Sequence, residues 1–337
     1  MSGHRVTYDH GMQRAGIIAV GLAAAGVLLV ACNESGLREK PRANFSHLAC
    51  LDVNGDGRIN GDDAEHVEDL ADFNADDDRD DFDAAFVEGV DIPLVAEAAE
   101  QCDGGGDKDP DYLVAHDWFV DADVSCQPGD EAMLVLGVAG GVDDLKDEGQ
   151  AAGVRDTVDE VISQLEDQEI ETIGVIAGAA LYGAENAHTA MEDWLVNAVE
   201  VYFERFPCLR LTTIGFSHGG VTVAVMASRL EAEYGDRMVA TVVLDRIEDF
   251  YGGDLTSMPA TSPVINVYQT NTPGGFRVEA PNVFNFDASG DTGPPDDESG
   301  GTPLPVTHVT LDNSPGVRDA VTEMIVERAT GSSAAAP

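Results

Sequence analysis

The chain has few positively charged residues. It carries 18 Lys and Arg residues against 63 Asp and Glu residues, a formal net charge of −45, and its lysines are Lys40, Lys108 and Lys146. A surface of this sign repels phosphate groups, so the composition argues against nucleic-acid binding and against attraction to anionic lipid headgroups. Repulsion among the carboxylates should weaken the fold at low ionic strength. The composition is typical of adaptation to salt or to a calcium-rich exterior.

A long apolar run lies near the N-terminus. Arg14 precedes the apolar residues 15–31, and the segment ends with the sequence LVAC, in which the cysteine is Cys32. At about 17 residues the run is short for a membrane-spanning helix, and its small-residue end favours cleavage, with an uncleaved anchor as the alternative. The ending resembles the bacterial lipobox. The resemblance implies a signal peptide (1–31), lipidation of Cys32, and attachment to a bacterial membrane, the outer membrane or cell surface rather than the inner membrane.

Cysteines are scarce, with five in the whole chain. The four that follow Cys32 are Cys50, Cys102, Cys126 and Cys208. An even number in an exported chain predicts two disulfides, for which three pairings are possible; reduced, buried cysteines are the alternative.

The most informative motif is the pentapeptide GFSHG at residues 215–219, with Ser217 at its centre. An apolar run enters it over 211–214, and a long amphipathic segment leaves it over 221–234. A strand, G-x-S-x-G and a helix in this order are typical of a nucleophile elbow. The elbow would expose the Ser217 hydroxyl at the edge of a parallel sheet, where it could attack an acyl carbon. A glycine-rich turn without chemistry is the alternative.

Strand-like and helix-like segments alternate around this motif. The expected strands are 131–138, 171–179, 238–245, 262–269 and 282–287, and the expected helices are 153–165, 187–205 and 315–329. The alternation predicts an α/β fold with a mostly parallel sheet and helices on both faces. The pattern resembles the α/β-hydrolase fold from its third strand to its last helix, with 112–120 left for an earlier strand. The resemblance implies a serine hydrolase.

The resemblance also indicates the base and the acid, because the family's order along the chain is serine, acid, histidine. Only His218 and His308 lie in the elbow or beyond it. His218 lies inside the elbow and would point away from the serine oxygen, whereas His308 follows the last strand, where the family's base belongs. The expected triad is therefore completed by His308.

Three residues compete for the role of the acid. The family's commonest place is the loop after the seventh strand, here 270–280, which contains no Asp and only Glu279. Asp245 ends the sixth strand, where some lipases of the family carry the acid, and is preferred. Asp287, at the end of the last strand, comes second and Glu279 third.

The same resemblance implies an oxyanion hole built from two backbone N–H groups. One belongs to His218, directly after the nucleophile. The other comes from the loop after the third strand, 136–141, where Val138 is preferred. Glycines in that loop allow the backbone to approach a ligand closely.

Residues 52–63, DVNGDGRINGDD, form a calcium-loop pattern. Calcium prefers six to eight hard oxygen ligands wrapped by such a loop, and Gly57 stands where the sharp turn requires a glycine. Asp replaces the usual Glu at the last position, so the segment resembles a dockerin-type loop and helix. The expected ligands are Asp52, Asn54, Asp56, the Arg58 carbonyl, Asn60 and Asp63.

A second acidic segment, 72–83, repeats this spacing, although Asp77 replaces the turn glycine. A second calcium site and a solvated acidic run are equally good interpretations. The dockerin resemblance also implies a cohesin-like protein partner, with little weight. The expected ligands of this second loop are Asp72, Asn74, Asp76, Asp80 and Asp83.

The hydrolase resemblance selects one disulfide pairing. Its third strand lies beside its fifth, and Cys126 and Cys208 stand just before those two strands. This implies a bridge between Cys126 and Cys208, which leaves Cys50 with Cys102 on either side of the calcium segment.

Together these patterns predict an exported, lipid-anchored serine hydrolase that cleaves carboxylic esters or lipids through an acyl-serine intermediate, with one or two structural Ca²⁺ ions. The alternative is a non-catalytic, calcium-dependent binding lipoprotein on a hydrolase-like scaffold. The expected organisation is a signal peptide (1–31), a tether (32–46), a calcium module (47–102), a linker (103–111), a hydrolase domain (112–330) and a disordered tail (331–337).

Overall fold

The computed structural model describes residues 52–66, 81–93, 124, 126, 131–140, 152–177, 187–246, 258–272, 274–293 and 304–331. Several predictions lie outside these residues: the signal peptide, Cys32 and the tether, the 112–120 strand, the linker, the tail, the pairing of Cys50 with Cys102, and the ligands Asp72, Asn74, Asp76 and Asp80. No helix within the described residues is long and apolar enough to cross a membrane.

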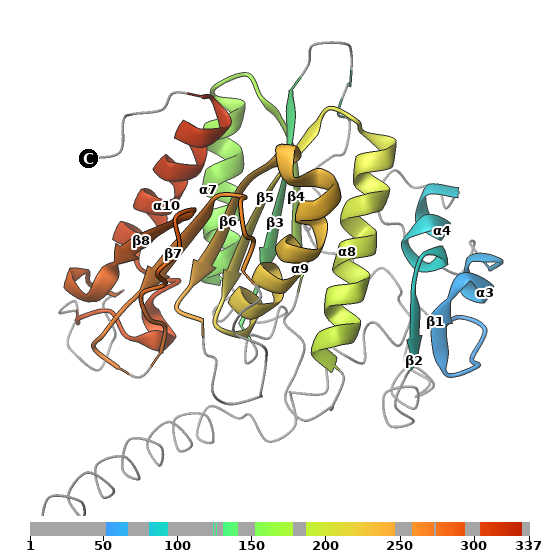
Figure 1. Ribbon diagram of the computed structural model, residues 1–337, viewed down its shortest axis with the longest axis horizontal. Helices are drawn as coiled ribbons and strands as arrows, with labels where there is room; N and C mark the ends of the chain where they lie inside the picture. Colours follow the sequence, from blue (N-terminus) through green and yellow to red (C-terminus); the bar gives the residue numbers. More distant parts are fainter. Residues whose placement is uncertain are drawn as a thin grey trace, which may run out of the picture. The chain divides into compact units, whose positions relative to one another are not determined.

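A six-stranded sheet forms the centre of the molecule (Figure 1), and all its neighbouring strands are parallel. The strand order is β4-β3-β5-β6-β7-β8, so the third strand lies beside the fifth, as the resemblance implied. The strands are β3 (Ala132–Val138), β4 (Glu171–Ala177), β5 (Leu209–Phe216), β6 (Met238–Leu244), β7 (Val264–Tyr268) and β8 (Val283–Asp287).

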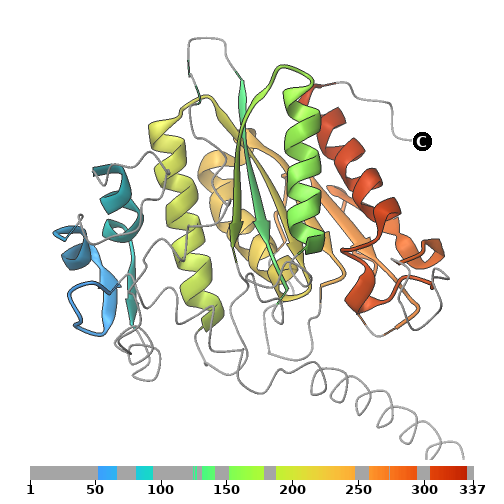
Figure 2. The same cartoon turned by 180° about the vertical axis from the view of Figure 1, so that it is seen from behind.

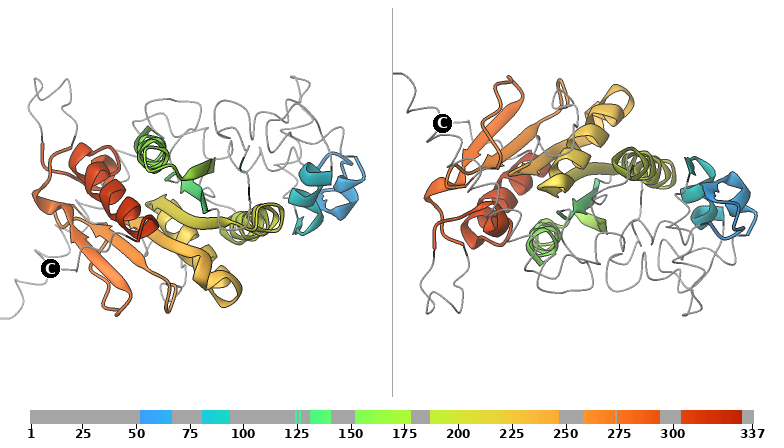
Figure 3. Two further views of the ribbon diagram at one scale, coloured as in Figure 1. Left: turned by 90° about the horizontal axis from the view of Figure 1, so that it is seen from above. Right: turned by 90° about the horizontal axis from the view of Figure 1, so that it is seen from below.

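Helices cover both faces of this sheet (Figures 2 and 3). One face carries α8 (Ala187–Arg205) and α9 (His218–Tyr234), and the other carries α7 (Ala152–Glu166) and α10 (Pro315–Ala329). The prediction of an α/β fold with a mostly parallel sheet is confirmed.

The central strands read as continuous apolar runs because both of their faces are buried. The side chains of alternate β3 residues point to opposite faces of the sheet and pack into different layers of the core. Leu134 and Leu136 belong to the cluster under α8 and α9, whereas Met133 and Val135 belong to the cluster under α7 and α10. Since parallel strands all run the same way, their carboxyl ends meet at one edge of the sheet, where polar side chains can gather.

The disulfide between Cys126 and Cys208 is confirmed, with a Cα–Cα distance of 5.4 Å. Cys208 directly precedes β5, and its carbonyl accepts a hydrogen bond from the Ala132 N–H at the start of β3 (3.3 Å). The bridge therefore fastens the chain that leads into β3 at the end of the sheet opposite to the strands' carboxyl ends.

Residues 52–66, which include the predicted calcium loop, and residues 81–93 form one segment that packs against α8. This segment contains β1 (Arg58–Asn60), paired antiparallel with β2 (Asp91–Pro93), and the helices α3 (Gly61–Ala64) and α4 (Asp81–Glu88). Phe86 of α4 meets Tyr202 of α8 edge to face, with ring centroids 5.4 Å apart. The Asn197 side chain of α8 donates hydrogen bonds to the carbonyls of Ala85 (3.2 Å) and Phe86 (2.9 Å). The segment thus extends the hydrophobic core on that face of the sheet.

Candidate active site

Ser217 lies in a strained turn between β5 and α9. Its φ of 55° and ψ of −115° are unfavourable for a residue with a side chain. Glycine is required on both sides of it. A Cβ at Gly215 would lie 2.2 Å from the Gly219 carbonyl oxygen, and a Cβ at Gly219 would lie 2.1 Å from the Val138 carbonyl oxygen. These contacts give the G-x-S-x-G pattern its physical basis, and the turn has the geometry of a nucleophile elbow.

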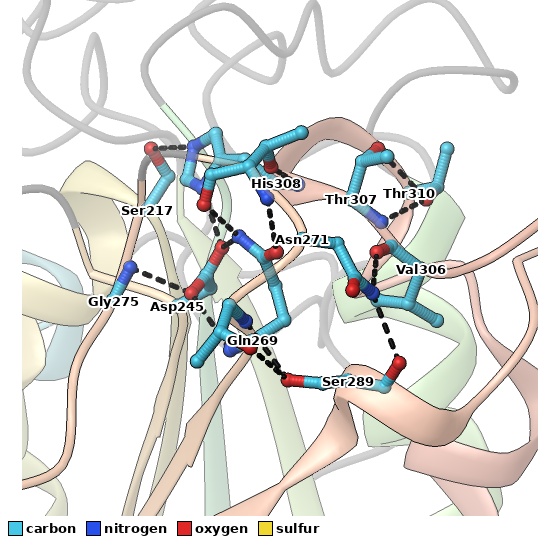
Figure 4. Close-up of polar contacts among 12 residues, drawn as sticks. Ser217, Asp245, Gln269, Asn271, Gly275, Ser289, Val306, Thr307, His308 and Thr310 are labelled. Carbon is cyan, nitrogen blue, oxygen red and sulfur yellow. Dashed lines mark hydrogen bonds and ion pairs between the residues drawn. The ribbon is translucent and has the colours of Figure 1, made fainter.

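Ser217, His308 and Asp245 form a continuous chain of hydrogen bonds (Figure 4). The His308 Nε2 atom lies 3.0 Å from the Ser217 Oγ atom, and the Nδ1 atom lies 2.9 Å from the Asp245 Oδ2 atom. Ser217 is 6 % exposed, His308 8 % and Asp245 0 %. The nucleophile, base and acid predicted from the sequence are therefore brought together at the carboxyl edge of the sheet.

His308 begins the short helix η5 (His308–Thr310) after the last strand. Its ring stacks on Phe216, the residue before the nucleophile, with centroids 5.1 Å apart and planes inclined by 25°. Its backbone N–H donates to the Thr272 hydroxyl at 2.9 Å. The imidazole is thus held by contacts on its ring and on its backbone, which favours a single orientation toward Ser217.

The Asp245 carboxylate is surrounded by donors. Its Oδ1 atom accepts the backbone N–H groups of Gly275 (2.6 Å) and Gln269 (3.3 Å). Its Oδ2 atom accepts the Gln269 side-chain Nε2 (2.9 Å) as well as His308. Hydrogen bonds to an ionised acceptor stabilise its charge, so the buried carboxylate is well suited to orient the imidazole and to stabilise the imidazolium that forms in catalysis.

The other two candidate acids are engaged elsewhere. Asp287 accepts hydrogen bonds from the Ser289 hydroxyl (2.5 Å) and N–H (3.0 Å), and these two contacts hold the pKa of the Asp287 carboxyl below its usual range. Glu279 forms an exposed ion pair with Arg277 at 2.6 Å. Of the three acids that the sequence left open, Asp245 is the one placed against His308.

The two predicted oxyanion-hole residues lie beside the elbow. Val138 is the last residue of β3 and pairs with Gly215 of β5, while His218 is the first residue of α9. Both are buried. The next N–H along the β3 loop, that of Ala139, already donates to the Ala177 carbonyl at 2.9 Å. The assignment of the Val138 and His218 N–H groups to an oxyanion hole stays a prediction.

Gln269 and Thr272 are site residues that the sequence reasoning missed. Gln269 directly follows β7, and its side chain is hydrogen-bonded to Asp245 and to Thr272 (Figure 4). The available signal was weak: a polar residue at the carboxyl end of the strand beside Asp245.

The loop at 52–63, for which the sequence predicts calcium binding, folds around its own oxygen atoms. Gly57, at a φ of 85°, donates its N–H to the Asp52 Oδ2 atom at 2.9 Å. At the other end, Asp63 is fully buried and accepts the N–H groups of Asn60 (2.9 Å) and Asn54 (3.3 Å). The loop therefore turns both of its terminal carboxylates inward.

The remaining predicted ligands of the first loop make local contacts. Asp56 accepts the Arg58 N–H at 2.9 Å, and the Arg58 side chain pairs with Asp91. Within the described ranges, no group of three or more His, Cys, Asp or Glu side chains converges on a metal position. The donor types nevertheless fit calcium, which binds hard carboxylate, amide and carbonyl oxygens. In the second loop, the backbone of Asp83 belongs to helix α4.

No model of a protein family matches the chain, and no curated protein matches it. Among solved structures, Est1E from Butyrivibrio proteoclasticus aligns with a TM-score of 0.38 at 14 % identity, covering 62 % of this chain and 90 % of that one. A serine hydrolase without a lid from Xanthomonas campestris gives 0.36 at 13 % identity, covering 65 % and 88 %. A cutinase-like protein from Cryptococcus sp. gives 0.34 at 14 % identity, covering 59 % and 95 %.

The solved structures that align with this chain include an α/β serine hydrolase, an acetylxylan esterase and a cutinase-like protein. Their identities and TM-scores are too low to carry an argument about activity. That argument depends on the elbow and on the hydrogen-bonded side chains of Ser217, His308 and Asp245.

Proposed function

We propose that the protein is a serine hydrolase that cleaves carboxylic esters through an acyl-Ser217 intermediate. The observation that supports this most strongly is the buried chain of hydrogen bonds from Ser217 through His308 to Asp245, with the serine on a strained elbow. A serine hydroxyl is a weak nucleophile unless an oriented base removes its proton, and this arrangement supplies both the base and the group that orients it.

The reaction proceeds in two half-reactions. The Ser217 Oγ atom attacks the acyl carbon while His308 Nε2 takes the serine proton, and the N–H groups of His218 and Val138 stabilise the oxyanion. Collapse of the tetrahedral intermediate breaks the ester bond, and the leaving alcohol takes the proton from His308. Water then attacks the acyl-enzyme and gives a proton to His308, which returns it to Ser217 Oγ as the acid is released.

A fluorophosphonate probe tests this proposal directly. The folded wild-type protein should be labelled at Ser217, and Ser217→Ala should abolish both labelling and turnover of p-nitrophenyl esters. Ser228→Ala is a matched control, because Ser228 lies on the same helix and bonds only to the Ala224 carbonyl among the contacts of its hydroxyl given by the described residues. Absence of labelling in folded wild-type protein would support the alternative, a binding lipoprotein without catalytic activity.

The substrate class is proposed to be an ester or lipid rather than an amide, in keeping with the family that the chain resembles. A panel of p-nitrophenyl esters from acetate to palmitate measures the preferred acyl length. A rate that rises toward palmitate supports a lipid substrate, and a preference for acetate or butyrate supports a small ester.

We further propose that the loop at 52–63 binds one structural Ca²⁺ ion through the side chains of Asp52, Asn54, Asp56, Asn60 and Asp63 and the Arg58 carbonyl. The turn at Gly57 and the inward-facing Asp52 and Asp63 support this role. Ile59 of the loop and Phe86 of α4 already belong to the core shared with α8. A cohesin-like partner is therefore not part of the proposal.

Attachment to a membrane through a lipidated Cys32 is proposed from the sequence alone. Residues 33–46 would then act as a tether that holds the hydrolase off the membrane. A diacyl anchor together with an N-acyl chain exceeds the two signals needed for stable attachment.

A further inference from the structure

Gln269 is buried and its amide is fully engaged. The side chain is 1 % exposed. Its Nε2 atom donates to the Asp245 Oδ2 atom (2.9 Å) and to the Thr272 carbonyl (3.0 Å), and its Oε1 atom accepts the Thr272 N–H (2.8 Å). The opposite orientation of the amide would place its oxygen against a carboxylate and against a carbonyl. These partners therefore define which end of the amide faces Asp245.

The Gln269 amide shares a carboxylate oxygen with the imidazole. The Asp245 Oδ2 atom lies 2.9 Å from His308 Nδ1 and 2.9 Å from Gln269 Nε2 (Figure 4). A donor on this oxygen neutralises part of its charge, and it also limits rotation of the carboxylate. Both effects change the charge and the position of the carboxylate that faces the His308 imidazole. Gln269 itself has no hydrogen bond to the imidazole among the contacts of the described residues.

A second connection runs from Gln269 to His308 through the backbone. Thr272 is held by both ends of the Gln269 amide, and its hydroxyl accepts the His308 N–H at 2.9 Å. The following turn closes over the same carboxylate: a Cβ at Gly274 would lie 2.5 Å from Asp245 Oδ2 and 2.9 Å from Gln269 Nε2. One amide thus fixes both the acid and the segment on which the base rests.

We propose that Gln269 is a positioning residue of the hydrolase. Its amide holds the Asp245 carboxylate in the orientation that aims His308 at the nucleophile, and it moderates the negative charge that the carboxylate presents to the imidazole. The inference rests on the proposed esterase function, because it concerns the proton transfers of that reaction.

Gln269→Met tests the inference, since Met has a similar length but neither donates nor accepts a strong hydrogen bond. Without the amide, Asp245 presents more negative charge to His308, which stabilises the protonated imidazole, and the carboxylate is less ordered, which lowers kcat. A higher pH is then needed to free the base. We expect kcat to fall about tenfold, KM to stay within about twofold, and the acidic limb of the kcat/KM profile to move about half a pH unit upward.

Gln269→Glu provides an independent measurement. While protonated, the introduced carboxyl group can donate to Asp245 as the amide does; once ionised, it places a second negative charge beside the first. The rate of this variant relative to wild type should therefore fall as the pH rises. Gln164→Met is the control: its amide bonds to Glu160 on α7 (2.7 Å), and its pH profile should match that of wild type.

The other titratable and charged groups near the site are unchanged in all of these proteins. On the elements packed around the site they are His218, Arg246, Tyr268, Arg277, Glu279, Asp287, Asp291 and Asp312.

The outcomes separate the two proposals. An active, fluorophosphonate-labelled wild type with shifted variant profiles supports the inference. An active wild type whose acidic limb stays unmoved in Gln269→Met, with a constant relative rate for Gln269→Glu, overturns the role of Gln269 alone. An inactive, unlabelled wild type overturns the esterase function and the inference together. If Gln269→Met does not fold, the pH dependence of Gln269→Glu decides the matter.

Discussion

Asp245 directly follows β6 and His308 follows the last strand, yet their side chains meet at 2.9 Å in a buried contact. Asp245→Asn should therefore lower kcat roughly a thousandfold or more, because an amide can neither hold the imidazole in the required tautomer nor stabilise its protonated form. The measurement is ester turnover in protein shown to be folded by circular dichroism.

Asp287→Asn is the matched control for this change. It removes the same charge from the end of β8, where the carboxylate bonds to Ser289 rather than to His308. Activity should stay within about threefold of wild type. If Asp287→Asn abolished turnover and Asp245→Asn did not, the assignment of the acid would be wrong.

The elbow could be predicted from the sequence because its determinants are local. Gly215 and Gly219 are required by backbone contacts within a few residues of Ser217 or in the adjoining strand, and the flanking apolar segments are readily recognised. For the acid, the sequence ranked Asp245 ahead of Asp287 and Glu279 but did not exclude the other two. Several strands end in polar side chains, and the choice among them depends on where the loop carrying His308 returns to the sheet.

Tertiary contacts between segments that are distant in the sequence could not be predicted from any motif. Gln269 belongs to no motif, and its role appears only when β7 lies beside β6 and the following turn closes over Asp245. Likewise, the pattern at 52–63 indicated a calcium loop but not that Phe86 would pack on Tyr202 of α8. The disulfide of Cys126 and Cys208 could be predicted because the resemblance to the α/β-hydrolase fold implied the strand order that brings these two cysteines together.

Glu231 fastens the start of the segment that leads into β7. Burial raises the pKa of its carboxyl, but the N–H groups of Ser262, Ala260 and Thr261 outweigh this and lower it from 4.5 to about 2. The resulting stabilisation is fully present above pH 4.5 and is lost as the pH falls toward 2. Glu231→Gln should cost about 1 kcal/mol at pH 7, after allowance for solvent screening of a partly exposed group.

Urea unfolding at several pH values measures this effect. The difference between wild type and Glu231→Gln should shrink as the pH falls below 4.5. Glu233→Gln, at an exposed position on the same helix, should show a much smaller difference. A constant difference across the pH range would contradict the role of the charged carboxylate.

Glu192, near the start of α8, shows the opposite behaviour. Burial raises the pKa of its carboxyl to about 7, with Asp193 adding to the rise and Arg229 opposing it. Because the folded protein holds this proton more tightly than the unfolded chain, stability declines as the pH rises from 4.5 to 7. Glu192→Gln should remove that decline. Its advantage over wild type should reach about 1 kcal/mol above pH 7, a value reduced for partial solvent exposure.

Thermal unfolding between pH 5 and pH 8 tests the role of Glu192. The melting temperatures of wild type and Glu192→Gln should converge near pH 5 and separate with rising pH. Glu204→Gln, at an exposed position on α8, is the control. Parallel curves for wild type and Glu192→Gln would show that the carboxyl group titrates normally in the folded protein.

The proposed lipid anchor predicts a specific processing defect. Cys32→Ala should block lipidation and leave an unprocessed precursor, because the lipoprotein peptidase acts on the lipidated cysteine. Mass spectrometry of the membrane fraction should find wild-type protein beginning at an acylated Cys32. A mature chain that begins at another residue and carries no fatty acid would indicate secretion instead of anchoring.

Calcium removal should affect stability more than chemistry. A metal that binds the folded loop but not the unfolded chain stabilises the fold, by about 2.7 kcal/mol at one hundred times its dissociation constant. Since the loop segment shares a hydrophobic core with α8, EDTA should lower the melting temperature, while ester hydrolysis at 25 °C should remain largely unchanged.

Asp52→Asn should abolish the response to calcium, whereas Asp62→Asn, an exposed position that is not a predicted ligand, should retain it. A melting temperature indifferent to both calcium and EDTA would contradict the proposed site, and loss of all activity on chelation with the fold intact would indicate a metal at Ser217.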